Sequence, residues 1–413
     1  MFLINNQKGR YTSQAINFVI INLIVALISF VRSFAFMNIF DFKELGLITL
    51  VNTAAMLISF FQLGLINGGY RIIALGEDKS SIKTNNVVFT FFGLLTLLLV
   101  VVSFAGYISE IFSNGFTLLI ICSLGVGNLI TNWLSNTLIG NQDYNKLNFA
   151  NITSSIASLL FLSLAYYFGI QGALVSLLLQ PIIFIFIVFW KSRKLIPINL
   201  DLDFDHFKYI LSFGFIPFLS GIFFLLFQQI ERWSIDIFLG SEALGKLYLV
   251  YLLTTLWILI PSSINSLFFP KSIKYFTEKN LIQVRKTIRQ YYIILIAYGL
   301  IASLIIILLL PIIVNVLFPK HAPFIELIYL LLPGLIIRNL CDPISLFFNS
   351  AVRFKPILAS DVISIICYLI SIFYLKYFGI FTLEHIIICF GIYNLIKFSY
   401  LLFNYNIIRK TYY

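Results

Sequence analysis

Residues 271–310 read KSIKYFTEKNLIQVRKTIRQ followed by YYIILIAYGLIASLIIILLL, a basic segment that runs directly into an apolar one. The apolar part, Tyr291–Leu310, has the length of about 20 residues at which a helix crosses the hydrocarbon core of a bilayer. The basic part carries six Lys and Arg residues at helical spacing, which predicts an amphipathic segment on the inner membrane surface. Because basic residues are retained on the cytoplasmic side, the span is expected to begin there.

The same alternation of apolar runs and short polar breaks extends over all 413 residues. Hydrophobic residues make up 60% of the chain and charged residues 11%, whereas about a quarter of residues are charged in soluble domains. The sequence lacks the short alternating strands of an outer-membrane barrel. About twelve runs of spanning length can be drawn, which predicts a helical, multi-pass membrane protein. The breaks lie near residues 36–44, 67–86, 108–115, 140–146, 169–171, 191–207, 229–242, 269–289, 318–322, 349–355 and 376–379.

Positive charge is distributed unequally between the two sides of these spans. With both termini on one side, 20 of the 28 Lys and Arg residues fall on that side, and Arg338 and Lys397 lie inside spans. The opposite side receives six, which are Arg32, Lys43, Arg232, Lys246, Lys320 and Lys376. This bias predicts that both termini are cytoplasmic. The net charge of +11 is explained by basic residues in short loops beside the membrane, which attract anionic headgroups. We therefore expect membrane lipid as a partner and no nucleic acid.

The two halves of the chain are similar in direct order. The motif Tyr-Phe-Gly-Ile occurs in Leu164–Leu179 and again in Tyr374–Cys389, at an offset of 210 residues. A polar connection, Lys191–Lys208, separates the halves near the midpoint. We therefore expect residues 1–195 and 196–413 to form two six-helix lobes. Because six spans return the chain to the side on which it began, both lobes are expected to have the same orientation in the membrane. Parallel repeats of this kind place a central cavity between the lobes.

Motifs for covalent chemistry are missing from the sequence. It contains no HExxH, GxSxG, P-loop or GxGxxG pattern. Its four cysteines lie within apolar runs without CxxC spacing or a nearby set of histidines, so neither a disulfide nor a zinc site is predicted. We expect a protein that is not an enzyme and that carries no cofactor.

Several motifs resemble those of one transporter family. The stretch FKELGLITLVNTAAMLISFFQLGLINGGYRIIA is similar to its first-hairpin pattern at Gly46, Leu63–Leu65 and Arg71. A more specific likeness is FGFIPFLSGIFFLLFQQIERWSIDIFLGSEALGKLYLVY, with Pro217 early in the seventh span and a charged pair near its end. The chain resembles polysaccharide-unit flippases of the O-antigen type, in the multidrug/oligosaccharidyl-lipid/polysaccharide exporter superfamily. It departs from them at Glu231, where relatives often carry Asp before the arginine.

This resemblance implies the cargo and its partners. The expected protein is a flippase in the bacterial inner membrane, which carries undecaprenyl-diphosphate-linked oligosaccharide units from the cytoplasmic to the outer face by alternating access. A polysaccharide polymerase and a chain-length regulator are the expected partners. The candidate pyrophosphate ligands are Arg32, Arg71 and Arg338, since the guanidinium fork suits phosphate. Arg32 and Arg71 are also explained as interfacial anchors, whereas Arg338 lies near mid-span.

Carboxylates within spans are candidates for ion coupling. Asp342 follows Arg338 at i+4, so the two lie on one helical face where an ion pair can form. Asp361 lies about one turn inside the eleventh span, and an interfacial polar residue is the alternative interpretation. Glu231 is the third candidate.

Three other functions remain open on the sequence. A multidrug or toxin extruder of the same superfamily would be expected to carry a carboxylate in the first span, which has Arg32 instead. An O-antigen polymerase, which is an enzyme, would need a longer outer loop than Gln229–Glu242. A lipid II flippase would bring one or two further spans.

Overall fold

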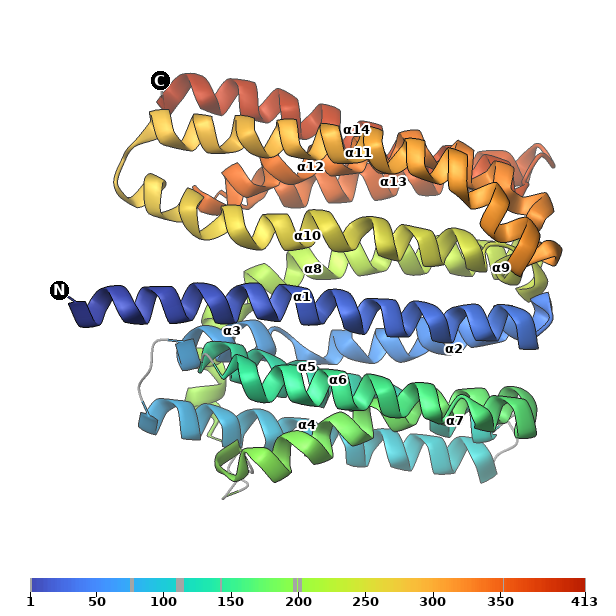
Figure 1. Ribbon diagram of the computed structural model, residues 1–413, viewed down its shortest axis with the longest axis horizontal. Helices are drawn as coiled ribbons and strands as arrows, with labels where there is room; N and C mark the ends of the chain where they lie inside the picture. The colour runs from blue at the N-terminus through green and yellow to red at the C-terminus, as the bar shows by residue number, and fades with distance from the viewer. Residues whose placement is uncertain are drawn as a thin grey trace. The chain divides into compact units, whose positions relative to one another are not determined.

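The computed structural model describes residues 2–74, 78–108, 115–141, 143–195, 199, 203–351 and 353–412. Every regular element in these ranges is a helix (Figure 1). Most of the break predicted near 108–115, and Pro197 and Asp201 of the predicted linker, lie outside the described residues. The chain divides into two compact units, Met1–Leu219 (unit 1) and Ser220–Tyr413 (unit 2). This boundary falls inside a long helix and later than the expected division at residue 195, because the start of that helix packs into unit 1.

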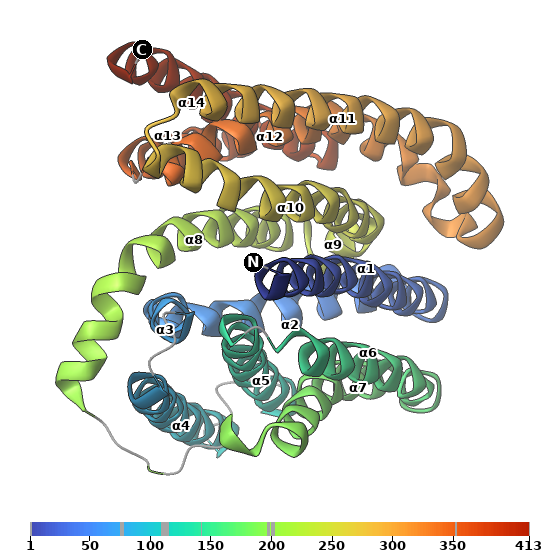
Figure 2. The same ribbon diagram turned by 60° about the vertical axis from the view of Figure 1, so that its left-hand side comes forward.

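Unit 1 is a helical bundle (Figure 2). Its elements are α1 (Phe2–Ile39), α2 (Phe42–Ile58), η1 (Ser59–Gln62), α3 (Leu65–Ala74), α4 (Asp78–Ile108), α5 (Gly115–Gly140), α6 (Tyr144–Leu160), α7 (Ser163–Lys191), η2 (Arg193–Leu195) and the first half of α8 (Phe204–Leu239). The break predicted near 169–171 coincides with Gly169, whose φ of 58° interrupts α7. A positive φ favours glycine because it has no Cβ.

Unit 2 contains the rest of α8 and the C-terminal helices. They are α9 (Ser241–Lys246), α10 (Tyr248–Thr277), α11 (Leu281–Leu317), η3 (Pro319–Phe324), α12 (Ile325–Ser350), α13 (Lys355–Tyr377) and α14 (Leu383–Tyr412). Helix α12 contacts α10, α11 and α14, and most of its residues are buried. It is therefore the helix best placed to carry an interior site.

The twelve predicted runs correspond to α1, α2 with α3, α4 to α8 and α10 to α14. Nine helical stretches in the described ranges are long and apolar enough to cross a bilayer, and the bent α8 makes ten. The apolar part of α10, Tyr248–Ser262, is shorter, and α6 carries many polar residues. The chain is a multi-pass membrane protein built entirely from helices where it is described.

The predicted amphipathic surface segment is instead the end of α10 and the first turns of α11. Val284 and Ile288 on α11 are buried against Phe347 of α12, while Arg285 and Arg289 are exposed. The hydrophobic face of this segment is therefore covered by protein. With its 37 residues at ~1.5 Å each, α11 is longer than the ~30 Å hydrocarbon core.

Glycines bring α3 and the start of α8 into close contact. A Cβ on Gly68 would lie 2.0 Å from the carbonyl oxygen of Ile210, and one on Gly214 would lie 2.0 Å from that of Gly64. Small residues four apart let membrane helices approach this closely. The family-like motif at residues 63–65 thus leads into a helix contact, with Gly64 at a φ of 98°.

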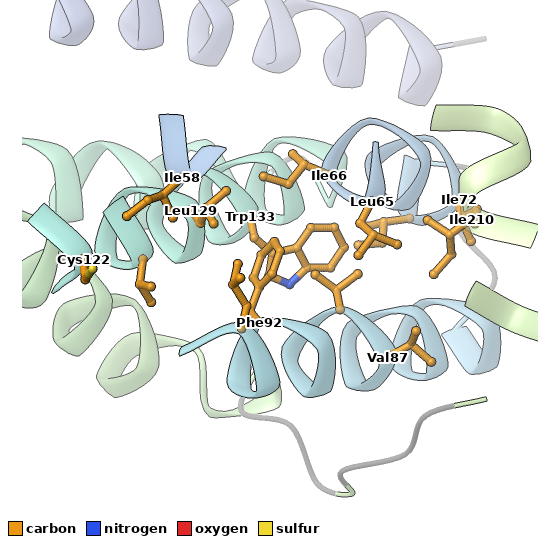
Figure 3. Packing of buried hydrophobic residues seen from close by; sticks show 14 residues of the cluster. Ile58, Leu65, Ile66, Ile72, Val87, Phe92, Cys122, Leu129, Trp133 and Ile210 are labelled. Carbon is orange, nitrogen blue, oxygen red and sulfur yellow. The ribbon is translucent and has the colours of Figure 1, made fainter. Parts of the chain in front are cut away.

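A fully buried tryptophan is central to the core of unit 1. Trp133 of α5 lies among apolar side chains that include Leu65, Phe92 and Leu129 (Figure 3). Its Nε1 donates to the Oδ1 of Asn85 at 3.0 Å, which satisfies the indole N–H inside the bundle. This core fixes α3, α4 and α5 relative to one another within unit 1.

Candidate functional site

Unit 2 encloses a charged cavity of about 140 Å³ between α8, α10, α12 and α14. Among its described lining residues, three are cations and two are carboxylates. They are Arg232, Arg338 and Lys397, and Glu231 and Asp342. Ionisable groups at membrane depth are costly unless they are paired or face a cavity, so this cavity is the candidate functional site of unit 2.

Helix α12 supplies the central pair of this cavity. Arg338 and Asp342 are four residues apart and line it together, as the sequence predicts. Next to them, Gly334 permits a close approach to α14, because a Cβ there would lie 3.1 Å from the Cα of Gly391. The backbone of α12 is therefore held against α14, which carries Lys397.

Lys397 also forms a buried ion pair behind the cavity wall. Its Nζ lies 2.5 Å from an oxygen of Asp361 on α13, and the two side chains are 16% and 3% exposed. Asp361 is thus an interior residue rather than an exposed interfacial one. Lys397 lines the cavity and is also paired with Asp361, which is not a lining residue. Asp361 is therefore connected to the cavity through Lys397.

The pair at the end of the seventh span completes the wall of the cavity. Glu231 and Arg232 both line it, and the guanidinium of Arg232 lies 5.0 Å from the ring centroid of Tyr251. Such a cation–π contact orients the guanidinium. The structure therefore brings together Glu231, Arg338 and Asp342 of the predicted residues, with Asp361 adjacent.

Arg32 lies in unit 1 and belongs to a different cavity. From α1 it donates through Nη1 to the Oγ of Ser158 and to the Oε1 of Gln180, each at 2.6 Å. It lines a space of about 220 Å³ with residues of α2, α5, α6 and α7. Arg32 is therefore held by polar groups of α6 and α7 within unit 1.

Arg71, the third predicted arginine, stands apart from these two cavities. It is exposed in the last turn of α3, with its guanidinium 5.1 Å from the ring centroid of Phe213. An exposed position at the end of a helix is compatible with the alternative interpretation of Arg71 as an interfacial anchor.

The amide-rich lining of the unit 1 cavity was not predicted from the sequence. Asn151, Ser155 and Ser158 recur on α6 at the spacing of one helical face. This polar stripe is why α6 falls short of the apolarity of the other spans. The spacing of these polar residues in the sequence could have predicted the cavity, because it shows which face of α6 points into the bundle.

The charged groups do not form a metal cluster. In the described ranges, no three His, Cys, Asp or Glu side chains lie close enough together to hold a metal ion. The unit 2 cavity instead offers two arginines that are not part of the Lys397–Asp361 pair, and these suit an anionic ligand. Two arginines can each present a planar fork to a phosphate or carboxylate.

Solved structures show which fold this arrangement belongs to. The chain is similar to an inward-facing multidrug resistance MATE family transporter of the MOP superfamily, with a TM-score of 0.74, 16% identity, and coverage of 95% of this chain and 99% of that one. A MOP superfamily transporter from Pyrococcus furiosus has a TM-score of 0.66 at 16% identity and coverage of 95% and 94%. A variant of the Vibrio cholerae MATE transporter VcmN has a TM-score of 0.67 at 14% identity, with 98% of each chain covered.

Sequence comparison identifies the family. No curated protein matches the chain. The family model described as "Polysaccharide biosynthesis protein" matches residues 43–283, which is more than half of the 413 residues. The chain therefore belongs to this polysaccharide biosynthesis family and has the fold of MOP-superfamily transporters.

Proposed function

We propose that this protein is a flippase for undecaprenyl-diphosphate-linked oligosaccharide units, which it moves from the cytoplasmic to the outer face of the bacterial inner membrane. The family supports a role in polysaccharide biosynthesis, and the fold is that of transporters. The carrying observation is that two arginines, Arg232 and Arg338, line the unit 2 cavity, with Arg338 deep in α12. A pyrophosphate is the part of such a cargo that needs these donors.

Arg338 is the arginine best placed to bind the pyrophosphate. It lines the charged cavity together with Arg232 and Lys397. Arg32 and Arg71 remain candidates, but Arg32 is engaged by Ser158 and Gln180 and Arg71 is exposed. In this proposal Asp342 neutralises Arg338 when no cargo is bound, and releases it to the pyrophosphate during transport.

Coupling to an ion gradient would use the carboxylates of the same cavity. Glu231 and Asp342 line it, and Asp361 is paired with Lys397. A proton or cation that bound to one of these carboxylates would neutralise its negative charge and weaken its attraction to the three cations. Alternating access then proceeds with both termini cytoplasmic, and the transported units pass to a polymerase and a chain-length regulator.

Deletion of the gene tests the proposal. Surface polymer is expected to disappear while single lipid-linked units accumulate on the cytoplasmic side. If single units reach the surface but chains do not grow, the protein acts as a polymerase and the proposal is wrong.

A second candidate function is extrusion of drugs, because solved structures with this fold include transporters named for multidrug resistance. In that case deletion would leave the polymer intact and raise sensitivity to cationic dyes. Measuring surface polymer and dye sensitivity in the same strain distinguishes the two functions.

A further inference from the structure

The unit 1 cavity has a different chemical character from the charged cavity of unit 2. Five helices contribute to it, and they contact one another within the bundle (Figure 2). Its polar lining includes Asn52, Asn128, Thr131, Asn151, Ser155 and Gln180. None of its described lining residues is a carboxylate, and Arg32 is its one charged side chain. Amides and hydroxyls therefore make up most of its polar lining, beside apolar residues such as Leu124 and Phe184.

Two hydroxyls at this cavity lack hydrogen-bond partners. The Oγ of Ser155, a residue only 1% exposed, and the Oγ1 of Thr131 are buried without a partner in the described structure. Nearby hydroxyls behave differently: Thr137 and Ser176 donate to carbonyls of their own helices at 2.9 and 2.7 Å. Buried hydroxyls are normally satisfied in this way. Ser155 and Thr131 therefore keep unused hydrogen-bonding capacity in the wall of the cavity.

The amide of Gln180 is fixed in place by Arg32. Its Oε1 accepts from Nη1 of Arg32 at 2.6 Å, so its NH₂ group is left to donate elsewhere. The Oγ of Ser158 accepts from the same Nη1. Arg32 is therefore a positioning residue in this cavity, because it orients the groups around it.

We propose that this cavity binds an uncharged sugar ring, a ligand class that rests on the proposed function. Each amide offers donors and an acceptor, which match the paired hydroxyls of a pyranose. A site built to hydrogen-bond hydroxyl groups discriminates strongly against ligands that lack them. The volume of about 220 Å³ also exceeds the ~10–15 Å³ of probe-occupied space that one water needs. The cavity therefore has room for more than one water-sized molecule.

Two positions separate sugar binding from general stability. Ser155→Ala removes one unpartnered hydroxyl, and Asn151→Leu removes one lining amide. Ser176→Ala is the matched control, because this serine is equally buried, lies in unit 1 and bonds only within its own helix. Melting temperatures of all three variants show whether each one folds.

The test uses the full chain in lipid nanodiscs and saturation-transfer NMR, with N-acetylglucosamine and glucose as uncharged probes and inorganic pyrophosphate as the charged one. The wild type and Ser176→Ala should bind the uncharged sugars equally. Ser155→Ala and Asn151→Leu should weaken that binding at least about fivefold, the effect of one neutral hydrogen bond, without changing pyrophosphate binding.

The proposal is overturned if neither sugar binds, if all variants bind the sugars equally, or if the two cavity variants lose pyrophosphate binding instead. Water alone would then satisfy Ser155 and Thr131. Failure of the proposed function is a separate result: deletion would cause no accumulation of lipid-linked units, while the difference between the cavity variants and Ser176→Ala would persist.

Discussion

Removing the positive charge of Lys397 is expected to destabilise unit 2 strongly. Its ammonium and the Asp361 carboxylate form an ion pair whose side chains are only 16% and 3% exposed. In Lys397→Met, Asp361 remains buried without a counter-charge, which costs about 3–5 kcal/mol. Since roughly 2–4 °C is lost per kcal/mol for a domain of this size, the melting temperature should fall by about 10 °C.

The assay is a thermal melt of the purified protein in detergent, with two comparisons. The double variant Asp361→Leu/Lys397→Met should recover most of the loss, because replacing a buried pair by apolar side chains is close to neutral. Lys246→Met is the control: its pair with Glu242 has side chains 33% and 62% exposed, so its effect should stay below about 1 kcal/mol. If Lys397→Met is no more destabilised than Lys246→Met, the buried pair does not stabilise unit 2.

Three further outcomes are expected. Asp203→Asn should lower the melting temperature near neutral pH, because the hydrogen bond from Lys83 lowers the pKa of Asp203 from 3.8 to about 2. The difference from the wild type should vanish as the pH falls from about 4 to about 2, and an unchanged difference at low pH would contradict this. Gly68→Ala should cost about 1–3 kcal/mol because its Cβ would meet a carbonyl of α8 at 2.0 Å, whereas Gly93→Ala, with open space around it, should not destabilise; the same denaturation measurement compares them. A cysteine at Asn280 should react with an impermeant maleimide only from the cytoplasmic side, and labelling from outside would reverse the predicted orientation.

Local patterns predicted much of the fold. The apolar runs predicted the long helices because spanning length is a property of contiguous residues. The break at Gly169 and the shared face of Arg338 and Asp342 were also predictable, since both depend on neighbours within one helix. The same pattern misplaced the segment at the start of α11. An amphipathic pattern shows that one face of a helix is covered, but it does not show whether lipid or protein covers that face. In the structure the covering residues belong to the protein and include Phe347.

Contacts between distant residues were beyond a single sequence. Arg32 bonds to Ser158 and Gln180, which lie 126 and 148 residues away. The interior position of Asp361 likewise depends on Lys397 of the next helix. Charge and depth marked these residues as unusual, but only the packing of the helices determines which groups they meet and which cavity each one lines.

Binding of the cargo pyrophosphate by Arg338 is tested most directly by transport in Arg338 variants, measured as flipping of lipid-linked units with membrane levels recorded in parallel. Arg338→Ala is expected to abolish flipping at a normal protein level. Arg338→Lys should retain a fraction of the activity because it keeps the charge without the fork, and Asp342→Asn should have a milder effect. The contradicting result is loss of the protein itself in Arg338→Ala, with level and transport restored together in Arg338→Ala/Asp342→Ala. The arginine would then neutralise its neighbour and would not bind the cargo.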